Sequence, residues 1–228
     1  MHAVRFPLLA IEALATPSVL SAELERLPPY DWWIFISANA VSFALNGNDG
    51  KIRHLCGQVN VAAVGQATAN ALEAHGVTEV WVPETGFNSE ALLAAPELQE
   101  VLGKRVLCVR GQGGRELLAE TLRMRGAHVD YLEVYRRVTL LPDLAEVQAL
   151  IDAQALNVIQ LSSGEALVHL LKLFEQTKYL EFLREIPLVV ISERLQRQAL
   201  ELGFKCVAVS ANPGDTAVIN TIISLVGG

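Results

Sequence analysis

The residues best suited to chemistry lie in short turns, each of which follows an apolar run and precedes a helical pattern. Small and hydroxyl-bearing residues fill these turns: Ser37-Ala38-Asn39, Gly65-Gln66, Thr85-Gly86, Gly111-Gln112-Gly113-Gly114, Ser162-Ser163-Gly164 and Ser192. Small residues let backbone N–H groups approach a ligand, and a helix N-terminus attracts an anion through those groups and its dipole. Because parallel sheets bind ligands where strands lead into helices, the turns predict an anion-binding site.

The glycine run at residues 111–114 invites comparison with nucleotide-binding loops. It matches neither G-x-G-x-x-G nor the Walker pattern that ends in Gly-Lys-Ser/Thr. Dinucleotide binding is therefore not expected, and the run is either part of an anion site or a plain tight turn. Thr68 and Ser89 are further candidate contacts. The alternative for Thr68 is that its hydroxyl only satisfies the start of its helix.

Charged and metal-binding side chains give weaker indications. Four arginines could add positive charge to the turns or could be solvated surface residues: Arg110, Arg115, Arg136 and Arg137. The five histidines lack the spacing of metal ligands on one helix. The three cysteines, at positions 56, 108 and 206, suggest neither a metal site nor a disulfide framework. We therefore predict no metal and no cofactor.

The composition limits the class of protein. The chain has 228 residues, of which 51% are hydrophobic, enough for a sizeable core. No stretch approaches the roughly 20 apolar residues of a bilayer span, and no secretory signal opens the sequence. The net charge of −7 argues against nucleic acid, whose binders usually carry a basic face. We expect a cytoplasmic protein with no membrane or nucleic-acid partner.

Elements that could position the turns follow from apolar runs rich in Val and Ile. Strands are predicted at residues 33–36, 61–64, 80–82, 105–109, 157–161, 188–191 and 206–209. Helical patterns lie between them, such as residues 115–125, and Gly126 follows where a glycine with positive φ ends a helix. This alternation predicts parallel sheets covered by helices. Trp32 and Trp33 are adjacent on a strand and point to opposite faces, where packing is the favoured role over ligand stacking.

A weak internal repeat has a period of about 126 residues. The segment Ser37-Ala38-Asn39-Ala40-Val41 matches Ser163-Gly164-Glu165-Ala166-Leu167, and the strand at 61–64 matches that at 188–191. The second copy opens with a strand, a glycine-rich turn and a helix before the strand at 129–132. In the first copy only that last strand has a counterpart, at residues 4–8. By this register about 23 residues are expected to be missing, through a misassigned start codon, trimming or natural loss.

Six segments stand in one order with regular spacing: residues 31–41, 64–69, 83–92, 106–118, Tyr135-Arg136-Arg137 and Leu161-Ser162-Ser163-Gly164. Together they resemble the bacterial uroporphyrinogen-III synthase family over nearly the whole chain. Two departures stand out. The family's opening strand, with its Thr-Arg-Pro-like turn and helix, has no counterpart here. Ser192 supplies one hydroxyl where some members carry a pair of threonines.

The resemblance implies a fold of two flavodoxin-like parallel-sheet α/β domains that exchange segments and are joined by a two-stranded linker. Residues 15–133 would form the complete domain. Residues 1–6 with 141–228 would form a second domain without its first strand and helix, and residues 7–14 and 134–140 would be the linkers. The family also implies a monomer.

The family's substrate is hydroxymethylbilane, a linear tetrapyrrole rich in carboxylates, which is cyclised with loss of water and inversion of the last pyrrole. The resemblance implies that substrate here. The turns at the predicted strand ends and the residues near them are the expected contacts: Ser37, Ala38, Asn39, Gly65, Thr68, Thr85, Gly86, Ser89, Arg110, Gly111, Ser162, Ser163, Gly164 and Ser192. It places Tyr135 beside the cleft, where a phenol could donate a proton to the departing hydroxyl. The alternative is a hinge tyrosine tied to a neighbour.

Two functions from other classes stay open. A non-catalytic two-domain protein that closes on a small anion would share the same architecture, because fold alone does not decide function. An inactive truncated homologue is the other.

Overall fold

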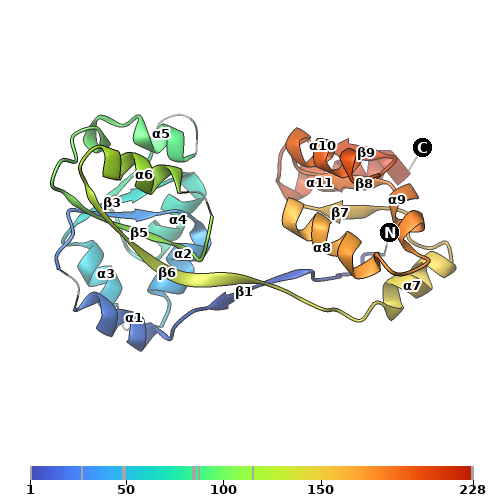
Figure 1. Ribbon diagram of the computed structural model, residues 1–228, viewed down its shortest axis with the longest axis horizontal. Helices are drawn as coiled ribbons and strands as arrows, with labels where there is room; N and C mark the ends of the chain where they lie inside the picture. The colour runs from blue at the N-terminus through green and yellow to red at the C-terminus, as the bar shows by residue number, and fades with distance from the viewer. Residues whose placement is uncertain are drawn as a thin grey trace. The chain divides into compact units, whose positions relative to one another are not determined.

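The chain forms two units, each with its own core (Figure 1). The structure is a computed structural model, and it describes residues 2–26, 28–47, 50–83, 86, 88–114 and 116–226. The central unit is Ile11–Val138, and the terminal unit combines Met1–Ala10 with Thr139–Gly228. The chain passes from one unit to the other along two neighbouring strands, β1 (Leu9–Ala13) and β6 (His128–Thr139). The units divide between residues 10 and 11 and between residues 138 and 139. These points lie within the segments 7–14 and 134–140 that were expected to be linkers.

The central unit is built on a six-stranded sheet with the order β1-β6-β5-β2-β3-β4. The strands not yet given are β2 (Trp32–Phe35), β3 (Asn60–Ala63), β4 (Val80–Trp81) and β5 (Arg105–Gly111). Each neighbouring pair from β6 to β4 is parallel, and Phe35 lies opposite both Ala63 and Val109. These strands therefore all end at one edge of the sheet.

Side chains from β2 alternate between two cores, one on each face of the sheet. Trp33 and Phe35 pack with helices α1 (Pro17–Leu24), α2 (Ala38–Leu45), α3 (Lys51–Cys56) and α4 (Gln66–Ala74). Ile34 packs on the other face with α5 (Ser89–Leu93), the 3₁₀ turn η1 (Pro96–Leu98) and α6 (Leu117–Met124). Because both faces are covered, the strands are continuously apolar.

The terminal unit has a three-stranded parallel sheet in the order β7 (Ile159–Leu161), β8 (Leu188–Val190) and β9 (Val207–Val209). Its helices are α7 (Ala145–Asp152), α8 (Gly164–Phe174), α9 (Leu180–Glu185), α10 (Glu193–Glu201) and α11 (Asp215–Val226). Leu161, Leu188 and Val190 meet Leu167 and Phe174 of α8 in its core. Within the described ranges, no helix is long and apolar enough to cross a membrane.

The predicted α/β class, with parallel sheets, is confirmed. The seven strands predicted from apolar runs are all present, with ends shifted by a residue or two, and the predicted helix at 115–125 corresponds to α6. Gly126 follows that helix with φ of 88°, as expected from its position. Trp33 is buried in one core, while Trp32 packs against the other and stays partly exposed.

One predicted strand is wrong. Residues 4–8 are assigned no strand, although they match the first part of β6 in the repeat. Among the described residues no strand pairs with them in a ladder, and Pro7 has no N–H to donate. The strand predicted at 129–132 instead runs on without a break into the predicted linker, so that both form β6.

We predict that the three thiols differ sharply in reactivity. Cys56 and Cys108 are buried, and burial raises the pKa of each thiol to about 12, whereas Cys206 is exposed. Because the thiolate is the nucleophile, brief treatment with iodoacetamide at neutral pH should alkylate only Cys206. Peptide mass spectrometry measures this, and the denatured protein serves as control. Equal labelling of Cys108 in the native protein would contradict the packing described here.

Candidate active site

The carboxyl ends of β2, β3 and β5 lie side by side in the central unit. The N–H of Ile36 donates to the carbonyl of Val109 at 3.1 Å, and the N–H of Val64 donates to the carbonyl of Phe35 at 3.1 Å. The turns after these strands begin at Ser37, Gly65 and Gly111. Parallel pairing therefore brings three of the predicted anion-binding turns to one edge.

Ser37 connects the start of α2 to Tyr135 on β6. Its Oγ accepts the N–H of Ala40 at 3.1 Å, as an N-cap does. The same Oγ lies 3.2 Å from the Tyr135 hydroxyl, and the Tyr135 ring packs on Phe43 with centroids 5.6 Å apart. Tyr135 is buried while Ser37 is partly exposed. The phenol is thus held beneath the turn, with the serine hydroxyl between it and the helix N-terminus.

Gly111 makes room for that phenol. A Cβ at this position would lie 2.4 Å from two ring atoms of Tyr135, so only glycine fits without displacement. The register between β5 and β6 shifts between Arg110 and Gly111, and Gln112 donates its N–H to the Tyr135 carbonyl at 2.7 Å. The irregularity brings the glycine-rich turn directly over the tyrosine.

Arg110 is buried and holds the glycine-rich turn from within. Its guanidinium donates to the carbonyl of Gly111 at 3.2 Å and to that of Gly113, and it pairs with Glu116 at 3.0 Å. The guanidinium carbon lies 4.6 Å from the Tyr131 ring centroid. The Arg110 guanidinium is therefore bound to the turn and to the start of α6. Its positive charge acts on a ligand through these groups and not by direct contact.

Glu116 remains ionised beside this arginine. The Tyr131 hydroxyl donates to its second carboxylate oxygen, and this bond, with the nearby Arg110, holds the pKa of Glu116 below its ordinary value of 4.5. Burial, with the carboxylate of Glu116, raises the pKa of the Tyr131 phenol. The tyrosine therefore stays protonated and keeps donating to the carboxylate.

The other candidates of the central unit are dispersed. Gly65 is the N-cap of α4, and Thr68 in the first turn is buried rather than presented to solvent. Ala38 and Asn39 open α2 next to Ser37, with Asn39 exposed. Gly86 is exposed with φ of 72°, and Ser89 begins α5. Thr85 and Arg115 lie outside the described residues.

The terminal unit carries its own capped turns. Ser163 Oγ accepts the N–H of Ala166 at 3.0 Å, and Ser192 Oγ accepts that of Leu195 at 3.3 Å. Ser162 precedes the first cap and is exposed, and Gly164 admits Gln198, whose Oε1 would lie 2.4 Å from an added Cβ. The structure brings these four residues to the carboxyl ends of β7 and β8, in the unit that does not contain Tyr135.

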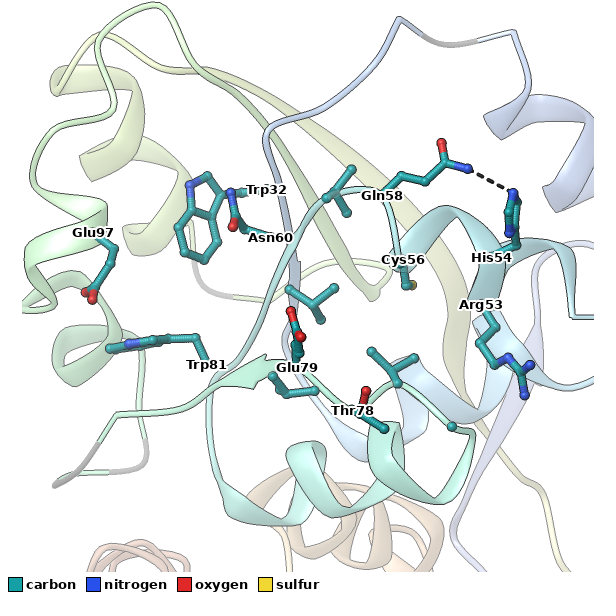
Figure 2. A pocket seen from close by; sticks show the side chains of 16 residues that line it. Trp32, Arg53, His54, Cys56, Gln58, Asn60, Thr78, Glu79, Trp81 and Glu97 are labelled. Atoms are coloured by element: carbon teal, nitrogen blue, oxygen red, sulfur yellow. Dashed lines mark hydrogen bonds between the residues drawn. The ribbon is translucent and has the colours of Figure 1, made fainter.

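A pocket of about 870 Å³ lies at the opposite, amino ends of β2, β3 and β4. Figure 2 shows the indoles of Trp32 and Trp81 lining it with Asn60 and Glu97. Glu79 adds a second carboxylate to the lining. Arg53 is also in the lining, so two carboxylates stand against one guanidinium and the pocket offers no excess of positive charge for a polycarboxylate. Within the described residues, no cluster of His, Cys, Asp or Glu could hold a metal ion.

The sequence did not predict the roles of some residues in the central unit. Asn88, rather than Ser89, caps α5 by accepting the N–H of Ala91 at 2.8 Å, and the preference of asparagine for N-caps could have identified it. Glu116 and Tyr131 are 15 positions apart. No local pattern links them, because β5, α6 and β6 must first fold together.

Parallel α/β units whose strand ends carry capped, glycine-bearing turns define a class of ligand-binding proteins and enzymes. Comparison with known proteins identifies the family. The family model for "Uroporphyrinogen-III synthase HemD" matches residues 1–220. The chain belongs to the uroporphyrinogen-III synthase family.

Curated relatives carry the same name. The uroporphyrinogen-III synthase of Escherichia coli (strain K12) is 34% identical over 220 residues, which cover 95% of this chain and 88% of that protein. The enzyme of Salmonella typhimurium is 35% identical over 217 residues, with the same coverage. Among solved structures, the Helicobacter pylori enzyme gives a TM-score of 0.65 at 18% identity and covers 98% of this chain and 96% of its own. That likeness supports the fold.

We predict that Gly111→Ala displaces Tyr135. The added methyl group would clash with the ring, which costs about 1–3 kcal/mol in a packed site. The midpoint of thermal unfolding should fall, and uroporphyrinogen III formation should fall with it. Gln112→Ala, at the exposed neighbouring position, is the matched control and should change neither. Unaltered activity in Gly111→Ala would show that the position of Tyr135 is unimportant.

We predict that Glu116 makes stability depend on pH below neutrality. Its lowered pKa means that the folded state binds this proton less readily than the unfolded state. The stabilisation is therefore complete above the ordinary pKa of 4.5 and is lost as the pH falls below that value. The difference in unfolding midpoint between the parent protein and Glu116→Gln should shrink over that range. Glu120→Gln, an exposed change on the same helix, should show no such trend.

Proposed function

We propose that this chain is a uroporphyrinogen-III synthase that cyclises hydroxymethylbilane, with loss of water and inversion of the last pyrrole ring. The observation that carries the proposal is the family match over residues 1–220, together with a hydroxyl pair, Ser37 and Tyr135, at the strand ends where this architecture binds ligands. As a member of this family the chain is a lyase. No cofactor is needed, because the reaction involves no change of oxidation state.

Within each unit, backbone N–H groups at helix N-termini offer sites for substrate carboxylates. The starts of α2, α4, α8 and α10 are capped by Ser37, Gly65, Ser163 and Ser192. Each helix start offers N–H donors and the positive end of a dipole. A protein with a net charge of −7 can therefore bind a polyanion without a basic surface. Ala38, Asn39, Gly111, Ser162 and Gly164 line the same turns and let the ligand approach.

Tyr135 acts as the proton donor through Ser37. As the C–O bond to the substrate hydroxyl breaks, the serine hydroxyl passes a proton to the departing oxygen and receives one from the phenol 3.2 Å away. Water leaves, and the substituted α-carbon of the terminal pyrrole attacks the cation left on the other end of the chain. The bond that joined this carbon to the neighbouring ring then breaks and re-forms at the free α-carbon of the same pyrrole, which inverts the ring. A proton lost when that ring recovers aromaticity returns to the phenolate, so the enzyme ends unchanged.

The protein's main task is to control which bond forms. Ring closure without the enzyme gives the uninverted isomer, so rate alone does not define function. Fixing the two ends of a flexible chain can contribute several kcal/mol of barrier lowering. We further propose a cytoplasmic monomer without a nucleic-acid partner. The acidic composition supports the last point, because nucleic-acid binders usually carry a basic face.

The decisive measurement is the isomer ratio. Freshly generated hydroxymethylbilane is incubated with the purified chain, the products are oxidised, and uroporphyrins I and III are separated beside a no-enzyme control. We expect isomer III in excess. Isomer I alone, at the rate of the control, would overturn the proposal and leave the chain a binding protein or an inactive homologue.

Removal of the phenolic hydroxyl tests the proton donor. Tyr135→Phe keeps the ring on Phe43 but removes the hydroxyl, and we expect kcat to fall by at least about tenfold with little change in KM. Tyr30→Phe is the matched control, because the Tyr30 hydroxyl is also bound, to Asp130 at 3.1 Å, but lies at the other end of the sheet. An equal loss in both variants would mean that Tyr135 only supports packing.

A further inference from the structure

The pocket at the amino ends of β2, β3 and β4 has no part in the site around Tyr135, because the two lie at opposite ends of the same sheet. Its volume of about 870 Å³ is typical of a small-molecule site. Two of the three tryptophans of the protein line it. The residues around these indoles indicate which class of ligand the pocket suits.

One face of the sheet carries a row of lining residues. Trp32 lies directly opposite Asn60 in the register of β2 with β3. The register of β3 with β4, continued by one residue, sets Asn60 opposite Glu79. Trp81 lies two residues beyond Glu79 and so points to the same face. Both tryptophans pack against the core on the face that α5 and α6 cover, so the four side chains share one side of the pocket.

Glu97 adds a carboxylate to this side of the pocket. It belongs to the 3₁₀ turn η1, which packs on the same face of the sheet through Leu98. Figure 2 shows its carboxylate on the same side of the pocket as the indoles of Trp32 and Trp81. Glu97 is exposed and both indoles are partly exposed. A ligand can therefore reach the two aromatic side chains and the carboxylate together.

Hydrogen-bond acceptors dominate this end of the pocket. The Asn60 Nδ2 donates to the carbonyl of Asp31 at 3.1 Å, which leaves the amide oxygen to accept a bond from a ligand. Glu79 and Glu97 make no ion pair or hydrogen bond with any other described residue. The face of an indole carries negative potential and attracts cations. Acceptors and indole faces together suit a positively charged ligand.

The other end of the pocket has a different character. Arg53 and His54 of α3 line it with Gln58, whose Nε2 lies 2.9 Å from the Nε2 of His54. The Arg53 side chain lies against Gly76, where an added Cβ would be 3.0 Å from its Nη1. The helix α3 packs on the opposite face of the sheet from the two tryptophans. The guanidinium therefore does not supply the positive charge that the indoles and carboxylates could bind.

We propose that Trp32, Trp81 and Glu97 form a binding site for a small organic ammonium ion. The cationic group lies against the indoles, and the carboxylate of Glu97 balances its charge. Asn60 and Glu79 accept hydrogen bonds from the donors of the ligand. The volume of the pocket leaves room for a chain of several atoms attached to the ammonium group. This site is independent of the proposed synthase reaction, because all of its residues lie away from the carboxyl ends of the strands.

A flat neutral ring is the alternative ligand for two tryptophans. Such a ring could stack on an indole, but it would shield the carboxylates of Glu79 and Glu97 from water without providing a counter-charge, which is unfavourable. An ammonium ion supplies that charge and also gains from the indole faces. The carboxylates therefore favour the cation over the neutral ring.

Choline is the probe for this site, and 3,3-dimethylbutan-1-ol is its neutral isostere. Isothermal titration calorimetry with the full chain measures the affinity, and tryptophan fluorescence reports whether the indoles are affected. Sodium chloride at equal ionic strength corrects for screening. We expect choline to bind with a Kd of about 1 mM or lower and to change the fluorescence. The isostere should bind at least about tenfold more weakly, because it lacks the charge.

Matched variants locate the binding. Glu97→Gln keeps the shape of the side chain but removes its charge, and the affinity for choline should fall by at least about fivefold. Glu100→Gln makes the same change at an exposed residue outside the lining and should leave the affinity unchanged. Trp81→Leu should weaken binding by at least about tenfold. Thermal unfolding verifies that each variant is folded, and Glu97→Gln should form uroporphyrinogen III at the rate of the parent protein.

Three results would overturn the proposal. The first is the absence of heat and of a fluorescence change when choline is added well above the expected Kd. The second is a neutral isostere that binds as tightly as choline, because the pocket would then recognise apolar shape and not charge. The third is an equal effect of Glu97→Gln and Glu100→Gln on the affinity, because attraction to the acidic surface as a whole would then explain the binding.

Discussion

The central site depends on the parallel pairing of β2 with β5. In-register pairing sets Phe35 opposite Val109, and the bond from Ile36 to Val109 carries the ladder to the last residue before the turn. A shift of one residue would turn Phe35 out of its core and Ile34 into it, so the packing of both faces fixes the register. Together with the pairing of β5 with β6, this constraint brings Ser37, Gly111 and Tyr135 together.

Close approach is the second requirement. The phenol of Tyr135 reaches Ser37 because Gly111 has no side chain and because β5 shifts register there. A turn with this freedom would be poorly ordered on its own. Arg110 compensates by binding two of its carbonyls, and the ion pair with Glu116 offsets the burial of the guanidinium. The most mobile residue types of the site are therefore anchored by a buried charge.

Local patterns predicted the strands and the capped turns, because those depend on neighbours in sequence. Ser37, Ser163 and Ser192 all cap helices where a serine follows an apolar run. The bond between Ser37 and Tyr135 spans 98 positions and has no local pattern. The direction of Arg110 likewise depends on Glu116 and Tyr131, which converge only after folding. Residues 4–8 failed as a strand because pairing needs a partner as well as a propensity.

The internal repeat allows the two units to be compared position by position. The burial of a residue in one unit can be set against the burial of its equivalent in the other. Ile34 and Gln160 occupy equivalent positions but differ completely in exposure. Propensity does not explain that difference, since both lie on parallel strands that end in a serine cap. The difference follows the cover provided by α6 in one unit. The serine cap depends on neighbouring residues alone and recurs in both units, whereas the burial of a strand depends on which elements cover it.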